Sequence, residues 1–189
     1  GILDPDYRPD ADGSGYSLAT HRNGKVIACC NFTNIGGQAR GHIARLHDID
    51  GFAETTSFNI AADGAVRSIL IQIDNKILIG GDFTNLTDQN GSYSRNRIAL
   101  LDEDGDTDFN FNPNANGIVR SIVLQTDGKV LVGGDFTEIG GEAQKYIARL
   151  NLEFGYADWG FTPDVNLPVH TIPVQADDKI VIGGEFTTI

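Results

Sequence analysis

A polar side chain recurs at one position of a repeated pattern in this chain. Each copy lies between a small pair and a phenylalanine, and the side chains are Asp82, Asp135 and Glu185, with Asn31 at the matching place in the first copy. Carboxylates in a cleft can act as general acids or bases. A catalytic site, however, is normally one asymmetric group, whereas these residues recur. We therefore interpret them as structural residues that cap turns or bind backbone amides, and predict no catalytic residue and no enzymatic activity.

The densest acidic segment is a candidate cation site. It runs from 102 to 108, and its alternating carboxylates are those of Asp102, Asp104, Asp106 and Asp108. Such oxygens could surround a hard cation such as Ca²⁺. The segment lacks the distal glutamate of an EF-hand, and the matching turns at 48–51 and 151–155 are less acidic. A solvated hairpin turn is the alternative interpretation. No other cofactor is indicated, because the four histidines lack the paired spacing of a zinc site.

Four copies of one strand pattern position these side chains. Each starts at a lysine and passes through an apolar run to the small pair, the polar residue, a phenylalanine and a threonine. The copies cover 25–33, 76–84, 129–137 and 179–187, and their lysines fall 51, 53 and 50 residues apart. This period, built from short apolar runs and Gly/Asp turns, is typical of a repeating β architecture.

Each lysine strand belongs to a larger predicted unit. A short strand and a tight turn of Asn, Asp and Gly precede the lysine. A third strand follows, at 42–46, 97–101 and 146–150. An aromatic stretch is expected to form a fourth strand, at 58–59, 109–113 and 159–163. Convincing helical periodicity is absent, so the chain is predicted to be all-β.

The lysine strands are apolar on both faces, which indicates that they are covered on both sides. Ile77 and Ile79 point one way and Leu78 the other. Sheets covered on both faces yet joined by short hairpins are what the blades of a β-propeller need. We therefore predict a propeller or propeller-like arc of four-stranded antiparallel blades. The repeated aromatic residues are expected in its core: Phe32, Phe83, Phe136 and Phe186.

We predict a single repeat domain over 1–189. Its units are 10–60, 61–113, 114–163 and the incomplete 164–189, with 1–9 as a fourth-strand element. Propellers close with about four to eight blades, and roughly three and a half are present. Three arrangements stay open: a segment of a longer propeller, an open arc stacked on neighbours, or two chains in one ring. An exposed blade face would be an association site in the open cases.

The repeat resembles the delta-60 repeat family of β-propeller domains. The resemblance is strongest in the segment 127–137, in the Ile-Ala-Arg-Leu segments at 43–46 and 147–150, and in the Phe-Asn-Pro at 111–113. The resemblance implies a blade-like repeat of large bacterial surface or secreted proteins and some phage proteins, with no activity assigned to the repeat. The first unit departs from it, because Cys29-Cys30 replace the usual Gly-Gly. We interpret these cysteines as small buried residues.

Charge and hydropathy limit the possible partners. The chain has 26 acidic and 14 basic residues and a formal net charge of −12, which would repel nucleic-acid phosphates. Anionic membrane surfaces are disfavoured for the same reason. No apolar run approaches the roughly 20 residues that span a bilayer, so membrane insertion is not expected.

The polar loop between the second and third strands is longest in the second unit, where it covers 86–96. It carries the candidate contact residues Tyr93, Asn90 and Gln89. We predict a structural or adhesive interaction module at an extracellular, cell or virion surface. Its expected partners are other protein segments, copies of itself or surface glycans. One alternative is a carbohydrate-binding propeller, with aromatic and amide side chains in inter-blade pockets. The other is a hydrolase or lyase with one asymmetric cleft.

Overall fold

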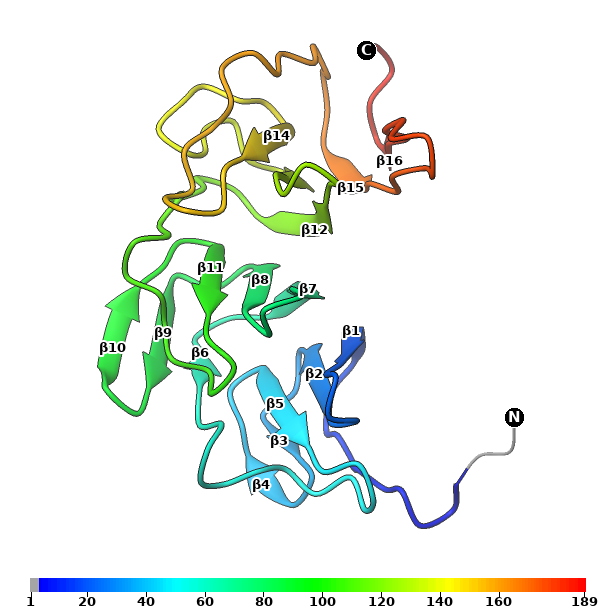
Figure 1. Ribbon diagram of the computed structural model, residues 1–189, viewed down its shortest axis with the longest axis vertical. Helices are drawn as coiled ribbons and strands as arrows, with labels where there is room; N and C mark the ends of the chain where they lie inside the picture. Colours follow the sequence, from blue (N-terminus) through cyan, green and yellow to red (C-terminus); the bar gives the residue numbers. More distant parts are fainter. Residues whose placement is uncertain (1–3) are drawn as a thin grey trace.

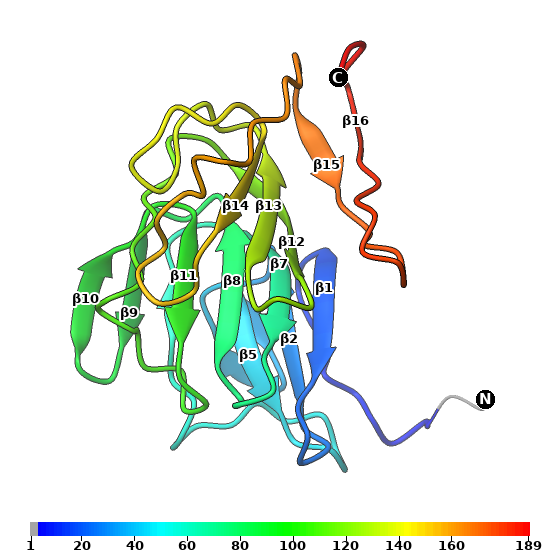
Figure 2. The ribbon, with the colours of Figure 1, turned by 45° about the horizontal axis from the view of Figure 1, so that its top comes forward.

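The computed structural model describes residues 4–189, which form strands and turns without a helix. The all-β prediction is therefore confirmed. Small antiparallel sheets follow one another along an open arc (Figure 1). In each of the sheets that form the blades, the first strand, which we call the inner strand, lies on the concave side of the arc (Figure 1). These inner strands contact one another from blade to blade (Figure 2).

Three sheets form complete blades, each a first, second and third strand in that spatial order. Blade 1 contains β1 (Gly15–Thr20), β2 (Val26–Cys30) and β5 (Ile43–Leu46). Blade 2 contains β7 (Val66–Ile71), β8 (Ile77–Gly81) and β11 (Ile98–Leu101). Blade 3 contains β12 (Val119–Leu124), β13 (Val130–Gly134) and β14 (Ile147–Leu150). A fourth unit pairs β15 (Val169–Thr171) with β16 (Gly183–Gly184).

Two smaller sheets lie outside the blades. In the first unit, β3 (Asn34–Ile35) and β4 (Gln38–Ala39) form a short hairpin. In the second unit, the polar loop forms the hairpin of β9 (Asn85–Asp88) and β10 (Gly91–Ser94), and β6 (Ala61–Ala62) pairs with β9. The segment expected as a loop is therefore a small sheet on the outer side of the arc (Figure 1).

The fourth strand of the predicted blade is reduced to one bridge. The third strand of each complete blade makes a single antiparallel bridge, and the pairs are Leu46–Ala53, Leu101–Thr107 and Leu150–Ala157. The aromatic stretches do not extend these bridges into strands. Phe58 and Phe111 turn inward and are fully buried. Pro113 has no N–H to donate to a ladder. In the first two units this segment therefore contributes to the core, whereas Trp159 in the third unit is 83% exposed.

The predicted fourth-strand element 1–9 begins with three residues that lie outside the described range. Residues 4–9 form no strand. They do occupy the place expected from the sequence match, because the Pro9 carbonyl accepts a hydrogen bond from Gly36 N at 2.5 Å. The Pro113 carbonyl, at the end of the second unit, likewise accepts one from Gly140 N of the third unit at 2.7 Å.

The middle strands are buried on both faces, as their sequences predict. Every residue of β8 and β13 is buried. Ile77 and Ile79 join a cluster with Ile27 and Cys29 of blade 1, whereas Leu78 joins the cluster of blade 3. Each such side chain contributes about 1.5–3 kcal/mol when it leaves water. The blades are thus held together by apolar contacts between neighbouring sheets.

A glycine at the end of the middle strand permits this close approach. A β-carbon on Gly80 would lie 2.4 Å from Cγ1 of Val119 on the next inner strand. At Gly133 it would lie 2.8 Å from Cγ1 of Val169. In the first unit this place holds Cys29, which is fully buried against blade 2. Cys29 and Cys30 are both free and buried, and burial raises the pKa of the Cys29 thiol.

The glycine at this junction should be hard to replace. Gly80→Val adds a side chain where Val119 already packs, so we expect a loss of about 2 kcal/mol or more in the free energy of unfolding, measured by urea denaturation. Cys29→Val is the matched control, because the first junction already accommodates a side chain there. A Gly80→Val protein as stable as its Cys29→Val counterpart would contradict this account of the junction.

Candidate functional site

A β-bulge recurs in every inner strand, and in the last three it aims one side chain toward the polar residue after the small pair. The register of each inner strand shifts across its second residue, and the residues at the shift are Tyr16, Arg67, Arg120 and His170. A bulge bends its strand and re-aims a side chain. We call these four residues and their partners, Asn31, Asp82, Asp135 and Glu185, the inner row.

The two central pairs of the inner row are bidentate ion pairs. Arg67 donates to Asp82 through Nε at 2.5 Å and Nη2 at 2.7 Å, and Arg120 donates to Asp135 at 2.6 and 2.7 Å. In the fourth unit, His170 Nε2 lies 3.2 Å from Glu185 Oε1. The first unit has no ion pair here, and Arg67 instead lies over the Tyr16 ring, 5.0 Å from its centre.

The chemistry of the inner row follows from this pairing. The hydrogen bond to Asp82 raises the pKa of Arg67 despite its burial, and the one to Asp135 does the same for Arg120. Both oxygens of each aspartate accept a hydrogen bond from the arginine of the same blade, so each pair is held within the protein. The inner row is therefore suited to making polar contacts on the concave side.

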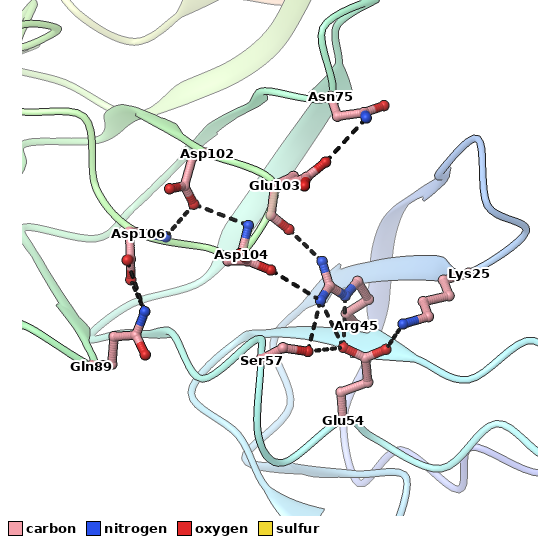
Figure 3. A network of polar contacts seen from close by, with 10 residues as sticks. All are labelled: Lys25, Arg45, Glu54, Ser57, Asn75, Gln89, Asp102, Glu103, Asp104 and Asp106. Atoms are coloured by element: carbon pink, nitrogen blue, oxygen red, sulfur yellow. Dashed lines mark hydrogen bonds and ion pairs between the residues drawn. The ribbon is translucent and has the colours of Figure 1, made fainter.

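The acidic turn 102–108 uses its carboxylates within the protein (Figure 3). Asp102 accepts from the backbone N–H groups of Asp104 and Asp106 at 3.0 and 2.9 Å. Asp106 accepts from Gln89 at 2.8 Å, and Asp108 pairs with Lys76 at 3.1 Å. Within residues 4–189, no three His, Cys, Asp or Glu side chains are grouped to hold a metal ion. Calcium binding stays a prediction that this arrangement does not favour.

The same turn contacts a buried ion pair of blade 1. Arg45 and Glu54 are 4% and 5% exposed, and Arg45 Nε lies 2.8 Å from Glu54 Oε2. Arg45 also donates to the Glu103 carbonyl of blade 2 and lies 3.7 Å from Asp104 (Figure 3). Burial would raise the pKa of Glu54, but hydrogen bonds from Lys25, Arg45 and Ser57 lower it to about 2. Arg45 therefore links two blades.

The third unit repeats half of this arrangement. Arg149 Nη2 lies 2.9 Å from Asp158 Oδ2, and Lys129 lies 2.8 Å from the same oxygen. Hydrogen bonds from Lys129, from the Gly160 backbone and from Arg149 lower the pKa of Asp158 to about 2. Arg149 is more accessible, with 24% of its side chain exposed. Among the described residues, it makes no contact with a turn of the next unit like that of Arg45.

The predicted contact residues of the second unit have different environments. Gln89 is bound to Asp106, and the Tyr93 ring packs edge-on against Phe109 with their centres 4.8 Å apart. Asn90 is exposed at the hairpin, and its backbone N–H donates to Asp88 at 2.8 Å. The structure thus brings Gln89 and Tyr93 to the outer edge of blade 2 and leaves Asn90 free to reach solvent.

The repeated phenylalanines of the first three units lie in the apolar core, as expected. Phe32, Phe83 and Phe136 are fully buried, and each belongs to a different apolar cluster. Phe186 is half-buried against the fourth unit.

A set of turn caps escaped the sequence interpretation. Each cap lies a few residues before an inner strand and binds the threonine after the repeated phenylalanine, and the residues are Asp12, Asp63, Asn116 and Asn166. Asp63 accepts from Thr84 N and Oγ1, both at 2.7 Å, and from Asn85 N at 2.9 Å. These residues have the same spacing as the four lysines, and that signal could have revealed them.

The architecture and the inner row define a β-propeller repeat protein. Residues 21–56, 72–111, 125–153 and 175–189 match the model of a family described as a domain of unknown function (DUF5122) beta-propeller. These ranges include all four lysine strands and more than half of the chain. The chain therefore belongs to this family, which confirms the resemblance to delta-60 repeat propellers. No curated protein sequence matches it.

Several solved structures share the fold. A streptogramin B lyase is 16% identical with a TM-score of 0.56, and a catalytically inactive virginiamycin B lyase from Staphylococcus aureus with quinupristin is 13% identical with a TM-score of 0.52. The matches cover 93% and 92% of this chain and 50% of each lyase. An extracellular domain from B. thetaiotaomicron is 12% identical with a TM-score of 0.54, over 92% of this chain and 20% of that one.

These structures correct the prediction of a protein without enzymatic activity. That prediction rested on the repetition of the polar side chains around the blades. Two of the matched proteins are lyases, so a fold of this kind carries catalysis and repetition does not exclude it. At 16% and 13% identity, the likeness shows the fold alone.

Within the described part of the chain, no helix has the length and hydropathy to cross a membrane.

The turn caps should make stability sensitive to acid. Hydrogen bonds from Asn34 and Thr33 lower the pKa of Asp12, and those from Asn85 and Thr84 outweigh burial and lower that of Asp63, both from 3.8. A carboxyl whose pKa is lower in the folded than in the unfolded protein stabilises the fold at pH values above its unfolded pKa. This contribution is lost as the pH falls below about 4.

We therefore expect Asp12→Asn/Asp63→Asn to flatten the fall of the urea midpoint between about pH 4 and pH 2. Asparagine keeps the bonds from the two backbone N–H groups and donates to the threonine hydroxyl, as Asn116 does in the third unit, but it loses the bond from the amide of Asn34 or Asn85. The reverse change Asn116→Asp should steepen the fall. Unchanged acid profiles in both proteins would refute the assignment.

Arg45 should matter more than its counterpart Arg149. Arg45→Ala leaves Glu54 buried with one cation fewer and removes a contact between blades, so we expect a loss of about 3 kcal/mol in the free energy of unfolding. Arg149→Ala breaks a more exposed pair and should cost about 1 kcal/mol or less. Urea denaturation of the two variants makes the comparison, and equal losses would show that the contact with blade 2 adds nothing.

Proposed function

We propose that this β-propeller domain is a structural or adhesive interaction module, and that the two ends of its arc bind blades of the same repeat type. The observation that carries the proposal is a packing contact that every internal junction makes and that the equivalent residues at both ends of the arc leave exposed. At an internal junction, an isoleucine of one inner strand packs beside the glycine of the preceding middle strand. Ile122 does so at Gly80 and Ile172 at Gly133.

The first end of the arc presents the inserting side chain without a partner. Leu18 of β1 occupies the place of Ile69, Ile122 and Ile172 in the later inner strands. Ile122 and Ile172 are 6% and 2% exposed, whereas Leu18 is 69% exposed. Ile69 is partly buried at the first junction, so each later residue at this position packs against the preceding blade. An exposed apolar side chain at the same position marks an association surface.

The other end presents the receiving surface. Gly183 occupies the place of Gly80 and Gly133, and Val181 occupies that of Leu78 and Leu131. Leu78 and Leu131 are fully buried by the next blade, whereas Val181 is 45% exposed. Thr171 holds the place of Ser68 and Ser121, whose hydroxyls accept hydrogen bonds from the next inner strand at 3.1 and 3.2 Å. This end therefore has the groups that receive a blade.

The two ends are complementary to each other, which defines a head-to-tail association. The expected partners are other protein segments with this repeat or copies of this chain. One feature supports an extracellular location, namely that a matched structure is an extracellular domain. Labelling of intact, unpermeabilised source cells or particles with an antibody against the domain tests that location, and labelling only after permeabilisation would contradict it.

Self-association of the chain tests the end surfaces directly. We expect a concentration-dependent dimer or larger assembly by analytical ultracentrifugation at tens of micromolar. Leu18→Asp and Val181→Asp should each be monomeric, because each blocks one end with a charge. An equimolar mixture of the two variants should form a one-to-one dimer through the remaining intact ends. A monomeric parent chain, or a mixture that stays monomeric, would overturn the proposal.

A further inference from the structure

A cavity of about 480 Å³ opens in the third unit, away from the inner row and from the ends of the arc. Its walls are the segment 112–114, the turn 138–143 and residues 155–156. The turn 138–143 lies on the outer side of the arc, where the ribbon is yellow in Figure 1. The volume is within the range of small-molecule sites.

Backbone hydrogen bonds hold the walls of this cavity in place. The Pro113 carbonyl accepts from Gly140 N at 2.7 Å, and the Gly140 carbonyl accepts from Ala157 N at 3.1 Å. The turn itself is closed by reciprocal hydrogen bonds between Ile139 and Glu142, at 3.0 and 3.2 Å. Ile139 is buried beneath the turn. The cavity is therefore preformed, which lowers the entropic cost of binding a ligand.

The lining combines an aromatic ring with unengaged polar groups. Tyr156 is 65% exposed, and its ring centre lies 5.8 Å from that of Phe154. Side-chain partners within the described chain are lacking for Asn112, Glu138 and Glu142. No basic side chain lines the cavity. The site thus offers an apolar platform beside hydrogen-bonding oxygens and an amide, and it repels anions.

The first unit shows what is general in this arrangement. It has the same backbone framework, with Asn34 and Gln38 in place of Glu138 and Glu142, and Phe52 in place of Tyr156. An aromatic ring beside two hydrogen-bonding side chains is therefore common to both units, whereas the negative charge is not. There, a β-carbon on Gly37 would lie 3.6 Å from Cδ1 of Phe52, whereas one on Gly141 would have no atom within 4 Å. The space is open in the third unit.

We propose that this cavity binds a neutral saccharide, with one pyranose face on Tyr156 and its hydroxyl groups on Asn112, Glu138 and Glu142. A sugar ring has an apolar face and a rim of hydroxyl groups, which match the ring and the polar groups respectively. Carboxylates accept hydrogen bonds from hydroxyl groups, and the amide both donates and accepts. Acidic sugars are excluded by the two glutamates.

Saturation-transfer difference NMR tests this site with four neutral disaccharides: lactose, cellobiose, maltose and N,N′-diacetylchitobiose. We expect saturation of at least one of them, strongest on the protons of one pyranose face. N-acetylneuraminic acid should receive none. Silence of all four disaccharides would overturn the proposal, as would saturation only of Nα-acetyl-lysine methyl ester, which would identify a site for basic peptides.

Variants locate the binding. Tyr156→Ala and Glu138→Gln/Glu142→Gln should each weaken the affinity for the bound disaccharide at least tenfold. The matched control is Trp159→Ala, because Trp159 is 83% exposed, is only three residues away and does not line the cavity. It should change the affinity less than twofold. Binding that survives Tyr156→Ala but is lost in Trp159→Ala would refute the assignment to this cavity.

Discussion

The packing of one inner strand against the glycine of the preceding blade is the constraint on which the rest of the structure depends. Because glycine has no side chain, a valine and an isoleucine of the next blade can occupy the space beside it, as Val119 and Ile122 do at Gly80. The close approach buries the middle strands on both faces and lets Ser68 accept a hydrogen bond from blade 3. The stability of the arc therefore lies mainly between sheets, because a three-stranded sheet alone buries little apolar surface.

The electrostatic design follows from the same repetition. The chain is strongly acidic, yet many of its carboxylates have fixed internal roles as turn caps, as partners of the strand-starting lysines or as members of the inner row. Hydrogen bonds and backbone conformations recur from unit to unit even where the residue type changes. Asp63 and Asn116 make equivalent caps, and the left-handed position of the hairpin turn is filled by Gly128 in one unit and Asn75 in another. Each substitution keeps the hydrogen bond or the backbone conformation that the position needs.

Differences between the units are where specific function can arise. In the inner row, Arg67 and Arg120 each form a bidentate pair with an aspartate. The fourth unit has a histidine–glutamate pair instead, and the first unit has a tyrosine. The β9–β10 hairpin occurs in the second unit, and the open cavity beside Tyr156 occurs in the third. A fold shared with lyases and with an extracellular domain supports many activities. The asymmetric features, more than the repeated ones, therefore distinguish this chain.

The sequence by itself determined the repeat, its all-β character and the burial of the lysine strands, because period and alternation are local properties of the chain. Ile77, Leu78 and Ile79 could be assigned to opposite faces for this reason. Only the tertiary structure decided which carboxylates meet which cations. The partner of Arg45 in blade 2 lies 58 residues away, and the Asp63 cap lies 21 residues from Thr84. The bulge that turns Arg67 toward Asp82, and the burial of Phe58 and Phe111 in the core, also depend on packing between sheets, which no local pattern specifies.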